Sequence, residues 1–130
     1  MSSHAFEPIN RYQNDLCVTI ADALRLRERI GSDAVFVMGD VFHMNIEEGD
    51  LGASLESAGA RLAYLHLADS QRHEPGRGHL DLIPVFAALA RLRYHGYASF
   101  ELAALSGAAD AVLPASVAYV RSKMKEAGLA

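Results

Sequence analysis

Four side chains that can bind a divalent cation, Glu7, Asp40, His66 and Glu101, are spaced 26 to 35 residues apart. Each lies at the end of a short run whose pattern predicts a β-strand, and each interval has room for one strand and one helix. The carboxyl ends of parallel strands share one edge of a sheet, so we expect these side chains to converge. Three carboxylates and one imidazole suit one divalent ion, with Mn²⁺ the first choice and Mg²⁺, Co²⁺ or Zn²⁺ as alternatives.

Each of these residues also has a purely structural interpretation. A carboxylate that follows a strand often caps the next helix, and His66 could be a core histidine bonded to the backbone. Without a cation, clustered carboxylates would repel one another and take up protons. The occurrence of such residues at four successive strand ends favours a shared metal site.

The elements that must position these residues alternate along the chain. Gly31 suits the left-handed residue that ends a helix, and Leu16, Ile20, Ala23 and Leu24 share one face of the helix before it. The alternation predicts a single α/β domain with a parallel sheet and right-handed crossovers. The expected strands are 5–7, 34–38, 61–67 and 97–102, and the expected helices are 14–30, 47–58, 81–92 and 114–127.

Composition narrows the classes of function. The chain has 130 residues, of which 51% are hydrophobic and 22% charged, which is typical of a globular protein. A net charge of −4 and a pI of about 5.8 disfavour a nucleic-acid partner. A single cysteine, Cys17, fits a reducing cytosol. The sequence has neither a basic and apolar leader nor an apolar run of membrane-spanning length, so we expect a cytoplasmic protein without a membrane partner.

The local motifs resemble those of ketose 3-epimerases. Residues 7–11, Glu-Pro-Ile-Asn-Arg, resemble a Glu-Pro-Leu-Asn-Arg stretch of that group, and residues 40–48 resemble its Asp-Thr-Phe-His-Met-Asn-Ile-Glu-Glu segment. Residues 66–72 and 75–79 look like the His-x-x-Asp/Glu-x-Asn-Arg and Pro-Gly-x-Gly signature of the sugar phosphate isomerase/epimerase superfamily, whose fold is a xylose-isomerase-like TIM barrel. The resemblance runs from about Phe6 to Glu101.

This resemblance implies a metal-dependent isomerase or epimerase that moves a proton beside a carbonyl, through an enediolate, on a ketose or related small sugar. Glu7, Asp40, His66 and Glu101 would be the metal ligands, and Glu7 and Glu101 would also be the catalytic acid/base pair. His43 and Arg72 would bind substrate oxygens, although either could instead have only a structural role in its loop. The family tends to have a glutamate at the position of Gln13. The absence of this negative charge leaves open how readily Glu7 exchanges a proton and which substrate is preferred.

The resemblance covers only the C-terminal half of the family's barrel. A complete barrel takes about 250 residues, and four βα units make a (β/α)4 half with two open sheet edges. We therefore expect a homo-oligomer or a separate N-terminal half as partner. One alternative function is a catalytically inactive metal-binding half, or a subunit of a split enzyme. Another is a nuclease of the related apurinic endonuclease type, which the acidic net charge and the small number of ligand-type residues disfavour.

Overall fold

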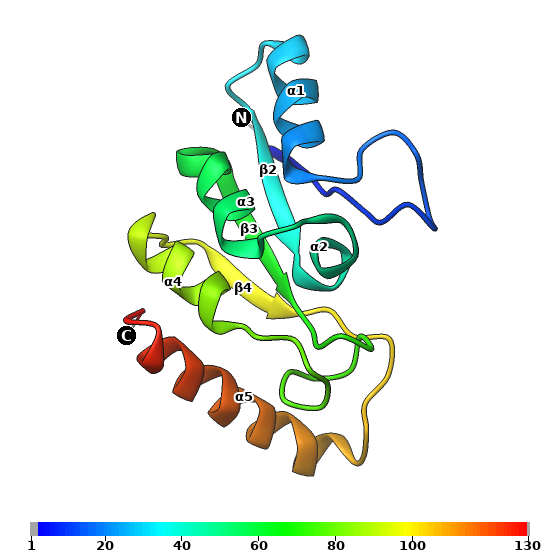
Figure 1. Ribbon diagram of the computed structural model, residues 1–130, viewed down its shortest axis with the longest axis vertical. Coiled ribbons are helices and arrows are strands. Elements are labelled where there is room, and N and C mark those ends of the chain that lie inside the picture. Colours follow the sequence, from blue (N-terminus) through cyan, green and yellow to red (C-terminus); the bar gives the residue numbers. More distant parts are fainter. Residues whose placement is uncertain (1–2, 130) are drawn as a thin grey trace.

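The computed structural model describes residues 3–129 and contains one four-stranded parallel sheet with helices (Figure 1). The strands follow one another across the sheet in chain order, and neighbouring strands are all parallel. The sequence prediction of an α/β fold with a parallel sheet is thus confirmed. The strands are β1 (His4–Phe6), β2 (Val35–Asp40), β3 (Leu62–Leu67) and β4 (Tyr97–Phe100).

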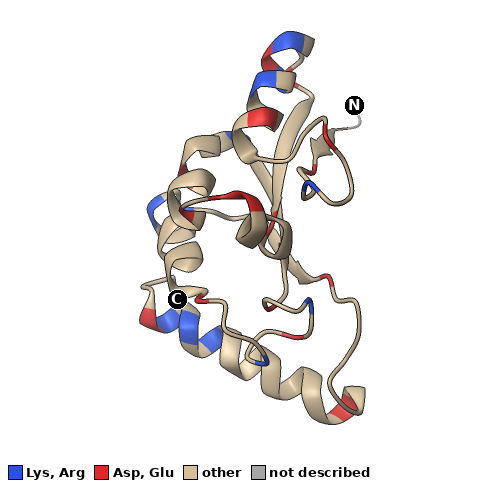
Figure 2. Ribbon diagram, turned by 45° about the vertical axis from the view of Figure 1, so that its right-hand side comes forward, with Lys and Arg blue, Asp and Glu red and all other residues tan. Residues whose placement is uncertain are grey.

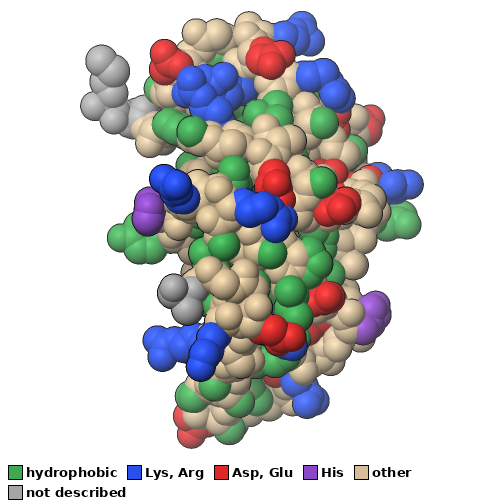
Figure 3. Space-filling view, turned by 60° about the vertical axis from the view of Figure 1, so that its left-hand side comes forward, with side chains coloured by type: hydrophobic (Ala, Val, Ile, Leu, Met, Phe, Trp, Pro, Cys, Tyr) green, Lys and Arg blue, Asp and Glu red, His purple; other side chains and the backbone are tan. Residues whose placement is uncertain are grey.

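The helices lie on one face of this sheet (Figures 1 and 2). The first, third, fourth and fifth pack against one another in chain order, whereas the second mainly contacts the two middle strands. Basic residues concentrate on the two outermost helices, and acidic and basic side chains are interspersed over the face shown in Figure 3. Among residues 3–129, no helix is both long and apolar enough to cross a membrane. The helices are α1 (Ile20–Ile30), α2 (Val41–Glu47), α3 (Leu51–Ala58), α4 (Ile83–Arg91) and α5 (Ala109–Glu126), with a 3-10 turn at Gly59–Arg61.

Side chains alternate between the two faces of β3. Leu65 and Leu67 are buried in the hydrophobic core with Leu55 of α3 and Phe86 of α4. The intervening His66 is only partly buried. Because successive residues of a strand point to opposite faces, the core is on the helix side and His66 is directed to the other face.

The helix predicted at 14–30 begins only at Ile20. Thr19 caps it, since its side chain accepts the Asp22 N–H at 3.1 Å while the Asp22 carboxylate accepts the Thr19 N–H at 3.0 Å. This reciprocal pair is a capping box, and it starts the helix at a defined residue. Leu16, which the periodicity placed on the buried helix face, is instead 76% exposed in the preceding loop. The predicted stop is confirmed, because Gly31 is left-handed with φ 68°.

The helix predicted at 47–58 begins only at Leu51, and a separate helix, α2, which the sequence did not predict, occupies residues 41–47. Asp40, the last residue of β2, accepts the backbone N–H groups of Phe42 and His43, so α2 begins directly at the strand end. Asp50 then caps α3 by accepting the Ala53 N–H at 2.9 Å. The predicted helix therefore starts late, because Glu48 ends α2 and Asp50 caps α3.

Two further predicted boundaries were displaced. Strand β4 ends at Phe100 rather than at residue 102, and helix α5 begins at Ala109 rather than at Pro114. In the structure Pro114 lies inside α5.

Candidate metal centre

Asp40 is the centre of a cluster of charged side chains at the carboxyl end of the sheet. Its side chain is fully buried at the junction of β2 and α2. Oδ1 accepts the N–H of Phe42 at 2.9 Å and that of His43 at 3.4 Å. Oδ2 lies 3.5 Å from His66 Nδ1 and 3.3 Å from Arg72 Nη2. One carboxylate therefore both starts a helix and faces a histidine and an arginine.

Glu7 and His66 approach Asp40 from the two neighbouring strands. Glu7 follows β1, and its Oε1 lies 3.5 Å from His66 Nδ1, the same distance that separates this nitrogen from Asp40. His66 Nδ1 is buried and makes no hydrogen bond within residues 3–129. Buried polar atoms are normally paired, so an unpartnered ring nitrogen between two carboxylates is the environment that a cation would complete.

Glu101 joins this cluster through Arg72. Glu101 follows β4 with half of its side chain exposed, and its Oε1 lies 3.7 Å from Arg72 Nη2. The guanidinium group of Arg72 also lies 4.9 Å above the centre of the Phe42 ring. Arg72 has a positive φ of 61°, which is uncommon for a residue other than glycine. Arg72 thus bridges the carboxylates of Asp40 and Glu101.

His43 provides a second imidazole beside the carboxylates. It is buried on α2, with its Nε2 4.0 Å from Asp40 Oδ2. Glu7, Asp40 and His43 each place one ligand-type atom within 4.8 Å of the others. Its Nδ1 faces away from this group, toward the backbone and side-chain nitrogens of Asn10 at 3.2 Å and 2.8 Å. The cluster therefore offers two histidines: Asn10 engages Nδ1 of His43, whereas the buried Nδ1 of His66 receives no hydrogen bond within residues 3–129.

Burial and neighbouring charges shift the pKa values of Glu7 and His43. Partial burial raises the pKa of Glu7, and the negative charges of Asp40 and Glu101 act in the same direction, against the lowering effect of His66. Burial lowers the pKa of His43, which favours its neutral form, and the positive charge of Arg72 adds to this effect. A carboxylate held near other carboxylates is stabilised in its charged form by a nearby cation.

The loop that carries Arg72 is organised by a second buried carboxylate, Asp69. Asp69 is 1% exposed, and it accepts the backbone N–H groups of Ser70 at 2.7 Å, Gly76 at 2.8 Å and Leu80 at 3.0 Å. Burial by itself would raise the pKa of Asp69, but these N–H donors outweigh it and hold the pKa below its usual value. Asp69 therefore fixes the shape of residues 69–80.

The structure brings the predicted residues to one end of the sheet. Glu7 Oε1 and Asp40 Oδ2 each lie 3.5 Å from His66 Nδ1. His43 flanks Asp40, and Arg72 contacts both Asp40 and Glu101. Sequence reasoning assigned no role to Asn10 or Asp69. Their only signal was that they belong to the quoted motifs. A side chain that bonds to nearby backbone groups or to another side chain produces no characteristic spacing along the sequence.

A family model and several curated proteins match this chain. The family model described as a xylose isomerase-like TIM barrel matches residues 4–123. An L-ribulose 3-epimerase of Mesorhizobium japonicum is 39% identical over 95 residues, which cover 73% of this chain and 32% of that protein. A 3-dehydro-D-guloside 4-epimerase of Escherichia coli is 40% identical over 95 residues, which cover 73% of this chain and 36% of that protein.

A solved structure extends the likeness to three dimensions. The apo crystal structure of 3-keto-D-glucoside 4-epimerase from E. coli superposes with a TM-score of 0.85 at 35% identity. The superposition covers 89% of this chain and 44% of that one. The chain spans about a third of the length of the curated relatives that it matches.

Proposed function

The chain belongs to the xylose isomerase-like TIM barrel family, and from this premise we propose that it takes part in metal-dependent proton transfer beside a carbonyl group of a ketose or related small sugar. The family is of the sugar epimerase and isomerase type. The observation that carries the proposal is the convergence of Glu7 and Asp40 on the unpartnered Nδ1 of His66. The sugar class comes from the relatives, which are named as epimerases of small sugars.

Glu7, Asp40, His66 and Glu101 are the residues that would hold one divalent ion. The donor set of three carboxylates and one imidazole favours Mn²⁺, with Mg²⁺, Co²⁺ and Zn²⁺ as alternatives. Such an ion, when bound, polarises a carbonyl oxygen and stabilises negative charge that develops on it. Burial chiefly raises the pKa of Glu7, and the negative charges of Asp40 and Glu101 add to this effect against the lowering effect of His66. A cation at this position would stabilise the charged form of the carboxylate.

The chain's own residues would carry out the remaining steps. Glu7 and Glu101, from strands at opposite sides of the sheet, would remove and return the proton on the substrate carbon. His43 and Arg72 would bind substrate oxygens, Arg72 through a guanidinium group that keeps its charge. The alternative is a metal-binding chain without activity of its own, and it is favoured by the half-exposed position of Glu101.

Calorimetric titration with Mn²⁺, followed by turnover assays on a panel of ketoses, tests the proposal. We expect Mn²⁺ to bind with one ion per chain and Glu7→Gln to weaken binding strongly, because it removes a ligand charge. Glu126→Gln is the matched control, since Glu126 pairs with Lys123 on the surface of α5 and should leave binding unchanged. Absence of Mn²⁺ binding would refute both functions. Binding without turnover at any protein concentration would support the inactive alternative.

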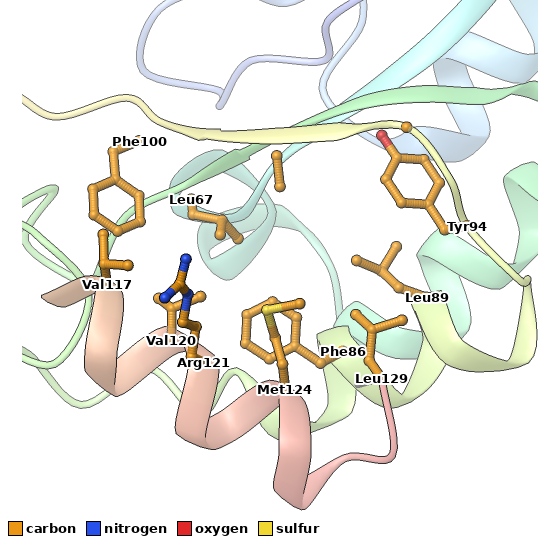
Figure 4. A pocket seen from close by; sticks show the side chains of 12 residues that line it. Leu67, Phe86, Leu89, Tyr94, Phe100, Val117, Val120, Arg121, Met124 and Leu129 are labelled. Atoms are coloured by element: carbon orange, nitrogen blue, oxygen red, sulfur yellow. The ribbon is translucent and has the colours of Figure 1, made fainter.

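We also propose that residues 1–130 form a single domain that corresponds to the C-terminal half of a barrel and is completed by a second half. Strands β1 and β4 form the two outer edges of the sheet, and Tyr97 of β4 is 79% exposed. Beside β4, an apolar cleft of about 410 Å³ lies between the sheet and α5 (Figure 4). It lies on the helix side of the sheet, where a further βα unit would pack, and not at the metal centre. Its lining includes Leu67, Phe86, Phe100, Val120 and Met124.

A second copy of the chain, or a separate N-terminal half, would supply the missing strands. Sedimentation analysis of the chain alone should show a dimer if copies close one barrel. Tyr97→Glu should weaken that dimer, because it places a charge on the exposed edge strand. Tyr12→Glu, at an equally exposed tyrosine of the loop after β1, tests whether any exposed charge has this effect. A strictly monomeric chain would contradict self-association and leave a separate half as the partner.

A further inference from the structure

Asn10 makes two contacts with the same atom of His43. It lies in the loop after β1, where it is 3% exposed, and it faces α2. Its backbone nitrogen is 3.2 Å from His43 Nδ1, and its side-chain nitrogen is 2.8 Å from the same atom. Two donors from one residue therefore meet one ring nitrogen in a buried environment.

These contacts determine the tautomer of His43. A backbone N–H can only donate, so Nδ1 must present its lone pair to Asn10. The orientation of the Asn10 amide is fixed independently, because its Oδ1 accepts the N–H of Tyr12 at 3.0 Å. That contact leaves the amide NH₂ facing the imidazole. A neutral His43 with an unprotonated Nδ1 carries its proton on Nε2.

The protonated Nε2 is the ring atom that faces the metal centre. It lies 4.0 Å from Asp40 Oδ2, on the opposite side of the ring from Asn10. An Nε2–H group is unable to bind a cation, but it can donate to an oxygen. The two histidines of the cluster therefore differ. The buried Nδ1 of His66 receives no hydrogen bond within residues 3–129, whereas His43 carries a proton on Nε2, which faces the metal centre.

We propose that Asn10 is a positioning residue that holds His43 as an Nε2–H donor toward a substrate oxygen. The substrate part of this inference rests on the proposed function, whereas the tautomer does not. Hydrogen bonds beside this contact also connect the loop after β1 to α2. The backbone N–H of Arg11 donates to Glu47 Oε1 at 2.6 Å, and its guanidinium Nη2 donates to Glu47 Oε2 at 2.8 Å. Asn10 is thus held against α2 and needs no rearrangement to act on His43.

Long-range ¹H–¹⁵N correlation spectra of the ¹⁵N-labelled, sequentially assigned chain at neutral pH report the protonation of each imidazole nitrogen. In the wild-type chain, His43 should show a protonated Nε2 and an unprotonated Nδ1. Asn10→Asp keeps the backbone N–H at 3.2 Å but replaces the nearer side-chain donor, at 2.8 Å, with a negatively charged acceptor. A carboxylate accepts a proton from Nδ1 more strongly than the longer backbone contact opposes it, so Nδ1 should become protonated. Asn14→Asp is the control: Asn14 lies in the same loop, and its amide donates to the carbonyls of Ile9 and Cys17 rather than to His43. It should leave the His43 signals in the wild-type pattern.

A protonated Nδ1 in the neutral wild-type His43 would overturn the proposal, and this measurement does not depend on the folding of a variant. A folded Asn10→Asp chain whose Nδ1 stays unprotonated would also overturn the role of the Asn10 side chain. The outcome is separable from that of the proposed function. A wild-type His43 with Nε2–H in a chain that fails to bind Mn²⁺ would keep the role of Asn10 in setting the tautomer, and it would refute the function and the donation to a substrate oxygen.

Discussion

Asp69→Asn should destabilise the chain strongly, although asparagine has nearly the same size and shape as aspartate. The Asp69 carboxylate accepts three backbone N–H groups, those of Ser70 and Leu80 on Oδ1 and that of Gly76 on Oδ2. Asparagine keeps one oxygen, and its NH₂ group would then face a donor. An N–H left without a partner in a buried site costs about 1–2 kcal/mol, and loss of charge assistance in the other two bonds costs about 1 kcal/mol more.

The free energy of unfolding should therefore fall by about 2–3 kcal/mol at pH 7, which corresponds to a decrease in Tm of about 10 °C for a chain of this size. The difference should shrink in acid. Because the folded-state pKa of Asp69 is lowered, its stabilising contribution is present above the unfolded value of about 3.9 and is lost as the pH falls through the folded value.

Urea unfolding of both chains at pH 7 and at successively lower pH measures this difference. Asp50→Asn is the matched control, because Asp50 is exposed and accepts a single N–H, that of Ala53, which asparagine also accepts. Its free energy of unfolding should change by less than about 0.5 kcal/mol. An Asp69→Asn chain as stable as wild type, or a difference that stays constant from pH 7 into acid, would refute the assignment of Asp69 as the organiser of the loop.

Three further substitutions or reactions test other parts of the structure. Thr19→Ala should lower the free energy of unfolding by about 1 kcal/mol by removing the cap of α1, Thr19→Ser should restore it, and an unchanged urea midpoint would contradict the cap. Burial raises the pKa of the Cys17 thiol, so iodoacetamide at pH 8 should modify it far more slowly in the native chain than in urea; equal rates would contradict its burial. Asp40→Ala should cost about 1 kcal/mol more stability than Asp40→Asn, which keeps the cap of α2, while both should lose Mn²⁺ affinity. An Asp40→Asn chain that binds Mn²⁺ as wild type does would contradict its role as a ligand.

The sheet could be predicted from the sequence because its strands are short apolar runs. Val35–Asp40 and Leu62–Leu67 are bounded by clear helix or turn signals, and their predicted limits were close to the observed ones. The helix starts were harder to predict. Leu16 fits the periodicity of α1 but lies outside it, because the reciprocal hydrogen bonds of Thr19 and Asp22 set the first turn. Helix α2 was missed because its cap, Asp40, is also the last residue of a strand.

The sequence by itself determined which residue types stand at the four strand ends. Parallel strands in chain order then bring residues that are distant in sequence to one edge of the sheet, which is why Glu7, Asp40 and His66 meet. Only the tertiary structure decided how the two histidines differ. That distinction depends on which donors reach each ring nitrogen: Asn10 reaches Nδ1 of His43, whereas the buried Nδ1 of His66 receives no hydrogen bond from residues 3–129. Hydrogen-bond direction is a property of atoms in space, and no spacing of residues along the chain encodes it.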